Sequence, residues 1–438
     1  MQNKAKQFFK GKRITVMGLG LLGRGVGDVA FLAECGARLL VTDLKSKAEL
    51  KTSILKLKKY KNIKYILGEH RLEDFRNKDM ILKAAGVPLE SVYIAEARKN
   101  RIPIDMSGTL FAKLSDMPMI AVTGTRGKST VTHLIAYILE KAGQKVVLGG
   151  NVQGASNLQL LKQVKNGGIA VFELDSWQLQ GFGESRISPQ VSVFTTFFPD
   201  HMKYYSNDMK KYFEDKANIF KYHTKNDLLV MGSQALPFFE NWKGEYRGRL
   251  VEAKTSLPLG WKLKIPGEHN VYNAVLAVEV VKRLGVKEDV IKKALAGFKG
   301  VNGRLEIIRA LKGVKYYNDT NATTPEATIA ALRALGVDSN VILIAGGSDK
   351  GLDMSALVNE IPKYTKAIFL LAGTGTESIK AKISNSLEVK NLKLAVTLAK
   401  KLAKKGDVIL LSPAFASFGM FKNEYDRGDQ FNKIVKSF

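Results

Sequence analysis

The segment Thr123–Thr130, which reads TGTRGKST, constrains the fold of this chain more than any other stretch. It follows the apolar run 119–122 and precedes the largely apolar run 131–139, a pattern typical of a buried strand, a turn and a helix. In such a turn, glycines let several backbone amides point at one anion, a lysine reaches the outer phosphates of a nucleotide, and a hydroxyl binds magnesium. A glycine-rich turn capped by Ser129 is the alternative, but Gly-Lys-Ser directly after a strand favours a phosphate-binding loop.

Length and composition limit the class of protein. A chain of 438 residues, 45% of them hydrophobic, has room for about two to four domains that each bury a core. Since no uninterrupted apolar segment reaches the roughly 18 residues that cross a bilayer, we expect no transmembrane helix and no membrane partner. The single cysteine, Cys35, excludes an internal disulfide, which agrees with a cytoplasmic protein.

The formal net charge of +27 taken alone would indicate nucleic acid or another polyanion as a partner. The lysines, however, are spread along the chain in helix-surface patterns such as 56–59 and 400–405, without a recognition motif or an aromatic platform. We therefore expect no nucleic-acid partner. A basic nucleotide-binding or nucleic-acid-associated protein without enzymatic activity stays open as the alternative from another class.

A second glycine-rich turn stands near the start of the chain. The run 14–17 predicts a strand, 18–23 a tight turn, 26–35 a helix and 39–43 a second strand. Asp43 follows Gly23 by 20 residues, which fits the fingerprint of a dinucleotide-binding fold. A nicotinamide cofactor and a dehydrogenase are one interpretation, but no hydride-transfer site is recognisable downstream, so another nucleotide stays open. Further alternation of strand and helix patterns predicts an α/β domain over residues 1–112.

The region that follows predicts a central ATP-binding domain over residues 113–299. The apolar strand 169–172 runs into Glu173, and a carboxylate at the end of a strand beside a phosphate loop is suited to bind magnesium, although a solvated strand end is the alternative. The run 191–198 predicts another strand, and 228–230 and 261–265 have shorter, sheet-like signals.

Three polar residues of this region have ambiguous roles. His201, taken alone, is more typical of a surface or capping residue than of a ligand. Asn270 and Asn273 share one face of the first turn of a helix, where capping is favoured over contact with a base.

The last part of the chain predicts a third domain over residues 300–438. Its apolar runs 341–347, 367–373 and 407–412 are typical of buried parallel strands that end in small residues. Their carboxyl ends should open onto one sheet edge, the usual ligand face. The predicted fold is therefore α/β with three domains, of which the first and third are Rossmann-like and the central one resembles a P-loop ATPase with a mostly parallel sheet.

Taken together, these stretches resemble the Mur ligases over essentially the whole chain, and in particular the members that add D-glutamate to UDP-N-acetylmuramoyl-L-alanine. The motifs that carry the resemblance occur in the family's order and spacing: Gly124–Thr130, Glu173–Leu179, Asp200–Met202, His269–Asn273, Gly303–Glu306, Asn318–Thr320, Gly346–Gly351 and Leu411–Ala414.

The resemblance implies ATP-dependent amide-bond formation in peptidoglycan precursor synthesis. In this family a carboxylate of the acceptor attacks the γ-phosphate of ATP, and an amine then displaces phosphate from the acyl phosphate. Lys128, His201 and Lys216 match the catalytic positions. A first magnesium ion would be held by Ser129 and Glu173, and a second by His201 and Lys216, a lysine that is carbamylated in the family.

The resemblance also implies two sets of binding residues. The positions that would contact ATP are Gly124, Thr125, Gly127, Lys128, Ser129, Thr130, Asn273, Arg304 and Asp319. The positions that would contact the acceptor or D-glutamate are Gly18, Gly20, Asp43, Asn151, Asp175, Thr323, Lys350, Ser417 and Phe418. With UDP bound at the first turn, a redox role is not expected. We expect a monomer.

The sequence departs from the family pattern at several of these sites. Arg126 replaces a more usual asparagine at a position that contributes mainly backbone, and Asp175 stands where serine is common. Asn321 stands where many members that add D-glutamate carry lysine, and Glu424 where an aromatic residue is frequent. Another Mur-type ligase, or a folylpolyglutamate-type ligase, with a different acceptor or amino acid is therefore the nearest alternative.

Overall fold

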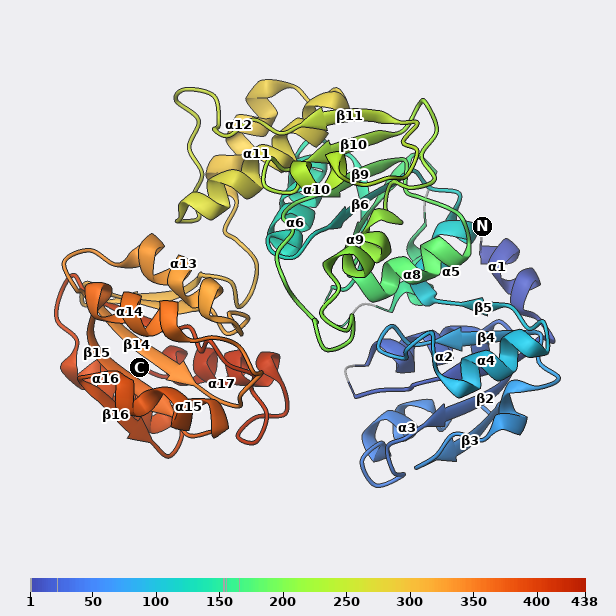
Figure 1. Cartoon of the computed structure of the whole chain (residues 1–438), viewed down its shortest axis with the longest axis horizontal. Helices are drawn as coiled ribbons and strands as arrows, with labels where there is room; N and C mark the ends of the chain where they lie inside the picture. Colours follow the sequence, from blue (N-terminus) through green and yellow to red (C-terminus); the bar gives the residue numbers. More distant parts are fainter. Residues whose placement is uncertain (1, 22, 153, 155, 165) are drawn as a thin grey trace. The chain divides into compact units, whose positions relative to one another are not determined.

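The computed structural model describes the chain except residues 1, 22, 153, 155 and 165. The described chain forms three sheets that are mostly parallel, which confirms the predicted α/β fold (Figure 1). Two compact units contain them, and the first comprises Met1–Leu257 with Asn273–Ala294, the second Pro258–Tyr272 with Leu295–Phe438. The first unit holds two sheets and the second holds one, whereas the domain boundaries after residues 112 and 299 stay a prediction.

The N-terminal sheet has the strand order β3-β2-β1-β4-β5, and all its pairings are parallel. Its strands are β1 (Arg13–Met17), β2 (Arg38–Asp43), β3 (Ile63–Leu67), β4 (Met80–Lys83) and β5 (Ile104–Asp105). The helices and the one 3₁₀ turn of this region are α1 (Gln2–Phe9), α2 (Arg24–Glu34), α3 (Lys51–Leu57), η1 (Leu72–Phe75), α4 (Val92–Lys99) and α5 (Ser107–Ser115). Because β2 and β3 lie on one side of β1 and β4 and β5 on the other, the strand order reverses between β1 and β4. In open parallel sheets, ligands bind at such a reversal, outside the carboxyl ends of the strands.

The central sheet has the order β11-β10-β9-β6-β8-β7 and is parallel throughout its described pairings. Its strands are β6 (Met119–Thr123), β7 (Lys145–Gly150), β8 (Gly168–Glu173), β9 (Val191–Phe194), β10 (Leu228–Met231) and β11 (Arg249–Glu252). The helical segments that follow these strands are α6 (Lys128–Lys141), α7 (Asn157–Leu160), η2 (Leu161–Gln163), α8 (Ser176–Glu184), α9 (Met209–Ala217), α10 (Leu236–Glu240), α11 (Glu268–Arg283) and α12 (Glu288–Gly297). The order places β6 between β9 and β8, so the loops after all three strands meet at one edge.

Two strand predictions in this region were wrong. The strand predicted over 191–198 ends at Phe194, because the hydroxyls of Thr195 and Thr196 bond to the loop after β6 and draw the chain out of the sheet. The stretch 261–265 forms no strand, although it alternates apolar residues with lysine. One of its apolar residues, Ile265, is instead buried against Gly300.

The C-terminal sheet has the order β12-β13-β17-β14-β15-β16, in which only the pairing of β12 with β13 is antiparallel among the described residues. Its strands are β12 (Glu306–Leu311), β13 (Val314–Asn318), β14 (Val341–Gly346), β15 (Thr365–Leu371), β16 (Ser386–Val389) and β17 (Val408–Leu411). Its helical segments are α13 (Pro325–Leu335), α14 (Ser355–Tyr364), α15 (Thr374–Ile379), η3 (Lys380–Lys382), α16 (Leu392–Leu402) and α17 (Glu424–Lys436).

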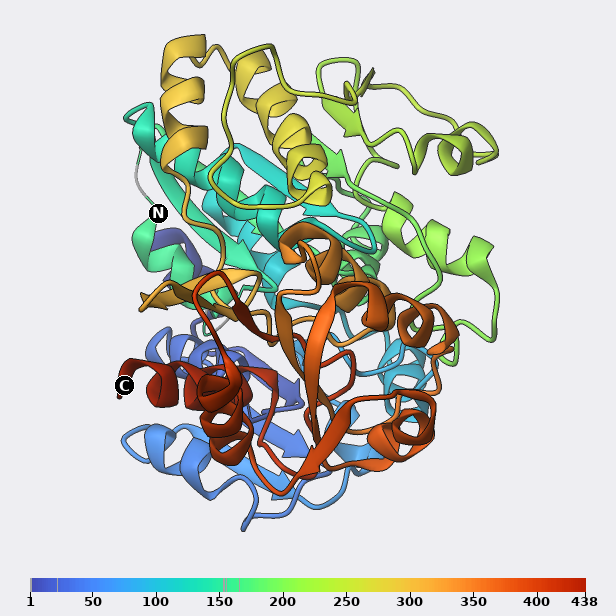
Figure 2. The same ribbon diagram turned by 90° about the vertical axis from the view of Figure 1, so that its left-hand side faces the viewer.

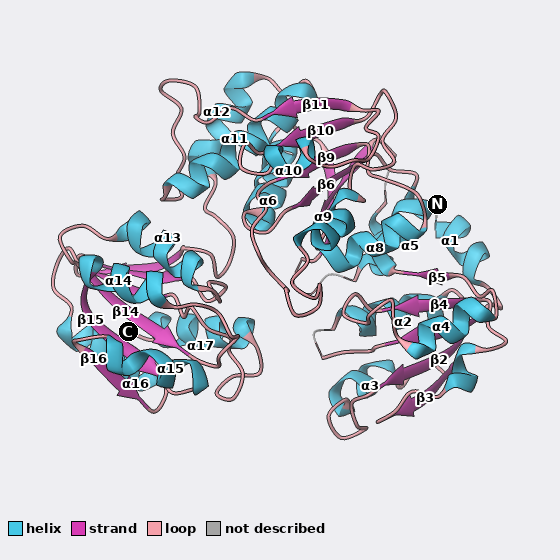
Figure 3. Cartoon of the chain, in the orientation of Figure 1, coloured by secondary structure: helices cyan, strands magenta, loops and turns pink. Residues whose placement is uncertain are grey.

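Helices cover both faces of this last sheet, whose strands run in orange and red in Figure 2. One cluster of buried apolar residues packs α13 and α14 against the sheet, and another packs α16 and α17 against it. Figure 3 shows the same alternation of strands and helices in each sheet region. Strands buried on both faces explain why 341–346 is an uninterrupted apolar run.

The structure also describes the single cysteine and the hydropathy of the helices. Cys35, which follows the last residue of α2, is buried, and burial raises the pKa of its thiol to about 11. None of the helices in the described part of the chain has the length and hydropathy to cross a membrane.

Candidate active site

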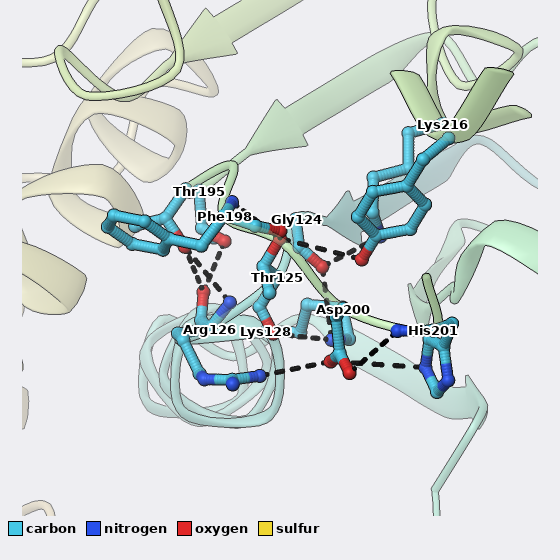
Figure 4. Close-up of polar contacts among 11 residues, drawn as sticks. Gly124, Thr125, Arg126, Lys128, Thr195, Phe198, Asp200, His201 and Lys216 are labelled. Atoms are coloured by element: carbon cyan, nitrogen blue, oxygen red, sulfur yellow. Dashed lines mark hydrogen bonds and ion pairs between the residues drawn. The ribbon is translucent and has the colours of Figure 1, made fainter. Parts of the chain in front are cut away.

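The predicted turn between strand and helix is present at 123–128. Strand β6 ends at Thr123 and helix α6 begins at Lys128. Figure 4 shows Gly124, Thr125, Arg126 and Lys128 of this turn with residues that contact them. Gly124 has φ of 136° and Gly127 has φ of 86°, values that favour glycine. A Cβ atom at Gly124 would lie 2.1 Å from the hydroxyl oxygen of Thr195, so this position also has no room for a side chain.

The segment after β9 holds this turn in place. The amide of Thr125 donates to the carbonyl oxygen of Thr196 at 2.6 Å, and the amide of Arg126 donates to the Thr196 hydroxyl at 2.9 Å. The Thr195 hydroxyl donates to the carbonyl oxygens of Arg126 at 2.5 Å and Thr123 at 3.1 Å. Sequence reasoning missed both threonines, whose only signal is two hydroxyls at the end of a buried strand.

Two lysines converge on the turn. The ammonium of Lys128 donates to the carbonyl oxygens of Gly124 at 3.1 Å and Thr125 at 3.2 Å. Lys216, on helix α9, donates to the same Gly124 oxygen at 2.8 Å and is 1% exposed. Burial, and then the charge of Lys128, hold the pKa of Lys216 well below its usual range. Both effects favour the neutral amine of Lys216 over its ammonium form.

His201 lies beside the turn on a loop with left-handed backbone, at φ of 55°. Its amide donates to one carboxylate oxygen of Asp200 at 3.0 Å, and Arg126 of the turn donates to the other at 3.1 Å. The imidazole packs on the ring of Trp177 with 4.6 Å between centroids. Burial lowers the pKa of His201, which favours the neutral imidazole and leaves a ring nitrogen with a lone pair. Arg126 thus contributes an ion pair as well as backbone.

Glu173 ends strand β8 and is paired in register with Val122 of β6, so its carboxylate lies at the edge that carries the turn. The side chain is 4% exposed and makes no hydrogen bond or ion pair with the described residues. Ser129 and Thr130, in the first turn of α6, are also buried. Asp175 accepts a hydrogen bond from the amide of Gln178 and caps helix α8, a structural role that its sequence position did not reveal.

The oxygen atoms that could coordinate a metal at this edge fit one magnesium ion better than two. A carboxylate and a hydroxyl, from Glu173 and Ser129, are the ligand types that Mg²⁺ prefers. In the described chain no group of three or more His, Cys, Asp or Glu residues could hold a metal. The ammonium of Lys216 is positively charged and donates a hydrogen bond, so it cannot coordinate a metal ion. A second magnesium ion beside it would require that this group be converted into an oxygen ligand.

Asn273 lies against the phosphate loop, and its contact with ATP stays a prediction. A Cβ atom at Gly127 would lie 2.2 Å from the side-chain oxygen of Asn273. The side chain of Asn270 instead donates to the carbonyl oxygen of Pro266 at 2.6 Å, so it stabilises the entry to helix α11.

The N-terminal turn is also built as the sequence suggests, with Gly18 and Gly20 at φ of 96° and 64°. One carboxylate oxygen of Asp43 accepts hydrogen bonds from the amides of Leu19 at 2.8 Å and Gly20 at 3.0 Å. The other accepts from the amide of Lys45 at 2.9 Å. Asp43 therefore organises the turn, and its contact with a substrate stays a prediction.

Asn151 connects the N-terminal turn to the central sheet. Its amide donates to the carbonyl oxygen of Glu173 at 2.7 Å. Its side-chain oxygen accepts a hydrogen bond from Arg24, the first residue of α2, at 2.5 Å. Gly18, Gly20, Asn151, Glu173 and the phosphate loop thus belong to one compact unit. Sequence reasoning missed Arg24, which carries no motif.

The remaining candidates, Arg304, Asp319, Thr323, Lys350, Ser417 and Phe418, belong to the second unit. Asp319 is buried and accepts hydrogen bonds from the Ser412 hydroxyl at 2.8 Å and the Leu305 amide at 3.1 Å. Burial raises its pKa to about 7. Ser417 is 4% exposed, whereas its neighbour Phe418 is 68% exposed and projects a large apolar ring into solvent.

Arg427 organises this second group and was also missed. It is fully buried on helix α17 and donates to the carbonyl oxygens of Thr320 at 2.8 Å and Phe415 at 3.3 Å. It therefore ties the loop after β13, which contains Asp319, to the loop after β17, which contains Ser417. The sequence does not indicate this burial, because an arginine on an amphipathic helix is expected on the exposed face.

Comparison with known proteins covers the chain in three parts. Residues 12–105 match the family model of the Mur ligase MurD-like N-terminal domain, residues 122–254 the Mur ligase middle domain, and residues 303–415 the Mur ligase glutamate ligase domain. Among solved structures, the fold resembles UDP-N-acetylmuramate–alanine ligase from Thermotoga maritima, with a TM-score of 0.63 at 20% identity over 97% of this chain and 99% of that one. It also resembles the MurF ligase of Thermotoga maritima, with a TM-score of 0.58 at 17% identity over 84% and 97%.

Two relatives found by sequence share a higher identity with this chain than these solved structures do. The chain is 35% identical to the UDP-N-acetylmuramoylalanine–D-glutamate ligase of Roseiflexus sp. (strain RS-1), over 98% of this chain and 99% of that protein. It is 34% identical to the protein of the same name from Borreliella afzelii (strain PKo), over 97% and 98%. With identity above 30% along the full length, and with three family models in the expected order, the chain belongs to the Mur ligase family.

Proposed function

We propose that this chain is the ATP-dependent ligase that joins D-glutamate to UDP-N-acetylmuramoyl-L-alanine in peptidoglycan precursor synthesis. The observation that carries the proposal is the full-length similarity to relatives of that name, combined with a phosphate loop that has Lys128, Lys216 and Glu173 at its edge. We expect the ligase to act in the cytoplasm. We expect it to act as a monomer.

The first step forms a mixed anhydride. A carboxylate oxygen of the acceptor's alanine attacks the γ-phosphorus of ATP, the bond to the β,γ-bridging oxygen breaks, and ADP leaves. The amides of the turn 124–128 and the ammonium of Lys128 bind the phosphates, and they neutralise charge while the reactants are held in line. In the described structure Lys128 is bound to carbonyl oxygens of the loop, so it exchanges these partners for phosphate oxygens when ATP binds.

The second step forms the amide. The neutral amine of D-glutamate attacks the acyl carbon, a tetrahedral intermediate forms, and inorganic phosphate leaves while the amine releases a proton. Lys350, Thr323, Ser417 and Phe418 are our candidates for the amino-acid site. A cation such as Lys350 suits a dicarboxylic amino acid, because charge-assisted hydrogen bonds to carboxylates are strong.

Magnesium would be held by Ser129 and Glu173, and it would neutralise charge on the transferring phosphoryl group. His201 and Lys216 are our candidates for a second site. A Lys216 amine that reacts with carbon dioxide becomes a carbamate and releases a proton, which replaces a cation by an anionic oxygen ligand. The lowered pKa of Lys216 supports this proposal, since only the neutral amine reacts.

Phosphate release tests the function. The enzyme is incubated with ATP, magnesium and UDP-N-acetylmuramoyl-L-alanine, and a panel of D- and L-amino acids is added singly. We expect D-glutamate to stimulate release most strongly and the product to have the mass of the amide. Stimulation by a different amino acid would point to another Mur-type ligase, and no stimulation by any member of the panel would refute the proposal. A folylpolyglutamate-type ligase would instead respond to a folate acceptor with L-glutamate.

A further inference from the structure

A buried lysine stands at the point where the strand order of the N-terminal sheet reverses. Lys83 is the last residue of β4 and is paired in register with Met17, the last residue of β1. Gly18 follows, and a Cβ atom there would lie 2.9 Å from the Cβ of Ala84. The carboxyl ends of β1 and β4 thus meet with Lys83 at their junction, where parallel sheets bind ligands.

The charge of Lys83 has no counter-ion close by. The side chain is 3% exposed, and its ammonium donates to the carbonyl oxygens of Val87 at 2.6 Å and of Ala84 and Ala85 at 3.4 Å. Within the described chain no carboxylate lies within ion-pair distance of it. Burial lowers the pKa of Lys83 to about 8. Burying an ammonium whose direct partners are all neutral carbonyl groups is costly, and such a group beside a ligand site has a functional rationale.

Four acidic groups act on the charge of Lys83. They are Asp175 at the start of α8, Glu184 at its end, Asp215 on α9 and Glu90 before α4. Each of them favours the charged form of Lys83 from a distance. With a pKa of about 8, Lys83 changes its ionisation between pH 7 and 9.

We propose that Lys83 is a positioning residue for the acceptor, since its ammonium holds loop 84–87 against the Gly18 turn and favours an acceptor that carries a nucleoside diphosphate. This inference rests on the proposed function. The carbonyl contacts fix the loop, and the charge of Lys83 offsets the four carboxylates that would otherwise repel the diphosphate at the Gly18 turn.

The test is binding of UDP-N-acetylmuramoyl-L-alanine and of UDP to the full chain by calorimetry, at pH 7 and pH 9. We expect the Lys83→Met variant to bind both ligands at least about tenfold more weakly at pH 7, since a one-unit rise in the pKa of Lys83 on binding corresponds to a tenfold difference in affinity. The wild type should lose affinity between pH 7 and 9, and Lys83→Met should lose less. Lys83→Arg should retain most of the affinity and lose less of it at pH 9, because arginine stays charged.

Three further measurements separate this role from a general structural one. ADP binding and kcat at saturating acceptor should change little in Lys83→Met, while KM for the acceptor rises. Lys64→Met, at an exposed lysine of β3, should behave as wild type. If Lys83→Met is too unstable to assay, the pH dependence of wild type and of Lys83→Arg still decides the matter.

Unchanged acceptor affinity in Lys83→Met, or a wild type and Lys83→Arg that respond identically to pH, would overturn the inference and leave the proposed function standing. A wild type that binds neither UDP nor the acceptor would overturn both.

Discussion

The ammonium of Lys216 and the carbonyl oxygen of Gly124 lie 2.8 Å apart, a contact that joins helix α9 to the phosphate loop. The carbonyl of Gly124 also accepts from Lys128, so two cations share one oxygen inside the protein. Such an arrangement is unfavourable for two charged amines, and it is relieved when Lys216 is neutral or becomes an anion.

Lys216→Ala should therefore lose at least about a hundredfold in kcat, because the variant cannot supply an anionic oxygen near the phosphates. Added acetate or formate should restore part of the activity by supplying the missing ligand. Lys221→Ala, at a largely exposed lysine paired with Glu214, is the control and should retain full activity. Full activity of Lys216→Ala without added carboxylate would contradict the proposed role.

Lys128→Ala separates the ligase from a protein that only binds polyanions. The variant should lose at least about a hundredfold in ATP-dependent phosphate release, since it removes a donor to the transferring phosphoryl group. Lys141→Ala, at the far end of the same helix, is the matched control. A nucleic-acid-binding protein would instead retain salt-sensitive polyanion binding in Lys128→Ala, and it would release no phosphate in either form.

Arg24→Ala should raise KM for the acceptor. The guanidinium orients Asn151, and hydrogen bonds to charged groups contribute about 1.5–3 kcal/mol when buried. Because Arg24 is partly exposed, we expect about a fivefold increase, which corresponds to about 1 kcal/mol. KM for ATP should not change. Arg38→Ala, at an exposed position on β2, should leave both constants unaltered.

Asp28 should make stability depend on pH. It is buried on α2 and accepts hydrogen bonds from the Ser156 hydroxyl at 2.7 Å and the Leu158 amide at 3.1 Å. Burial raises its pKa from 3.8 to about 6, so the folded chain binds more protons than the unfolded chain between these values. The free energy of unfolding should therefore fall as pH rises from about 4 to about 6, and this contribution is absent above that window.

Asp28→Asn should flatten this pH dependence by about 3 kcal/mol or less, as measured by urea unfolding at pH 2 to 7. Asp79→Asn is a control of opposite sign, because a hydrogen bond from Arg13 lowers the pKa of Asp79 to about 2. Its contribution is present above about pH 4 and is lost as pH falls towards 2. Equal slopes for wild type and Asp28→Asn between pH 4 and 6 would exclude the role of Asp28.

The sequence predicted those strands that are buried on both faces, such as β14, because an unbroken apolar run leaves few alternatives. It was wrong at 261–265, since alternation of apolar and polar residues does not show whether a neighbouring strand is available. The sequence also predicted a strand that continues past Phe194, because threonine favours strands by propensity. In the structure Thr195 and Thr196 lie outside β9, and their hydroxyls donate hydrogen bonds to the phosphate loop.

The phosphate loop was predictable because its geometry is local. The contacts around it are not, since Lys216 reaches Gly124 across 92 positions and Arg24 reaches Asn151 across 127. Family resemblance identified Lys216, but it gave no indication of Arg24, Lys83 or Arg427. These three side chains donate hydrogen bonds to main-chain carbonyl oxygens or to the side-chain amide of Asn151. Because any residue type has a main-chain carbonyl, such contacts are not visible as a sequence motif.

The lone thiol of Cys35 has a practical consequence. At about 11, its pKa leaves almost no thiolate at neutral pH, and the side chain is 6% exposed, so maleimides and spin-label reagents should spare it. Cysteines introduced in pairs, one in each compact unit, would then be the reactive thiols of an otherwise unaltered chain. Fluorescence or electron-spin distances between such pairs would report whether the distance between the two units changes when ATP, acceptor or amino acid is added.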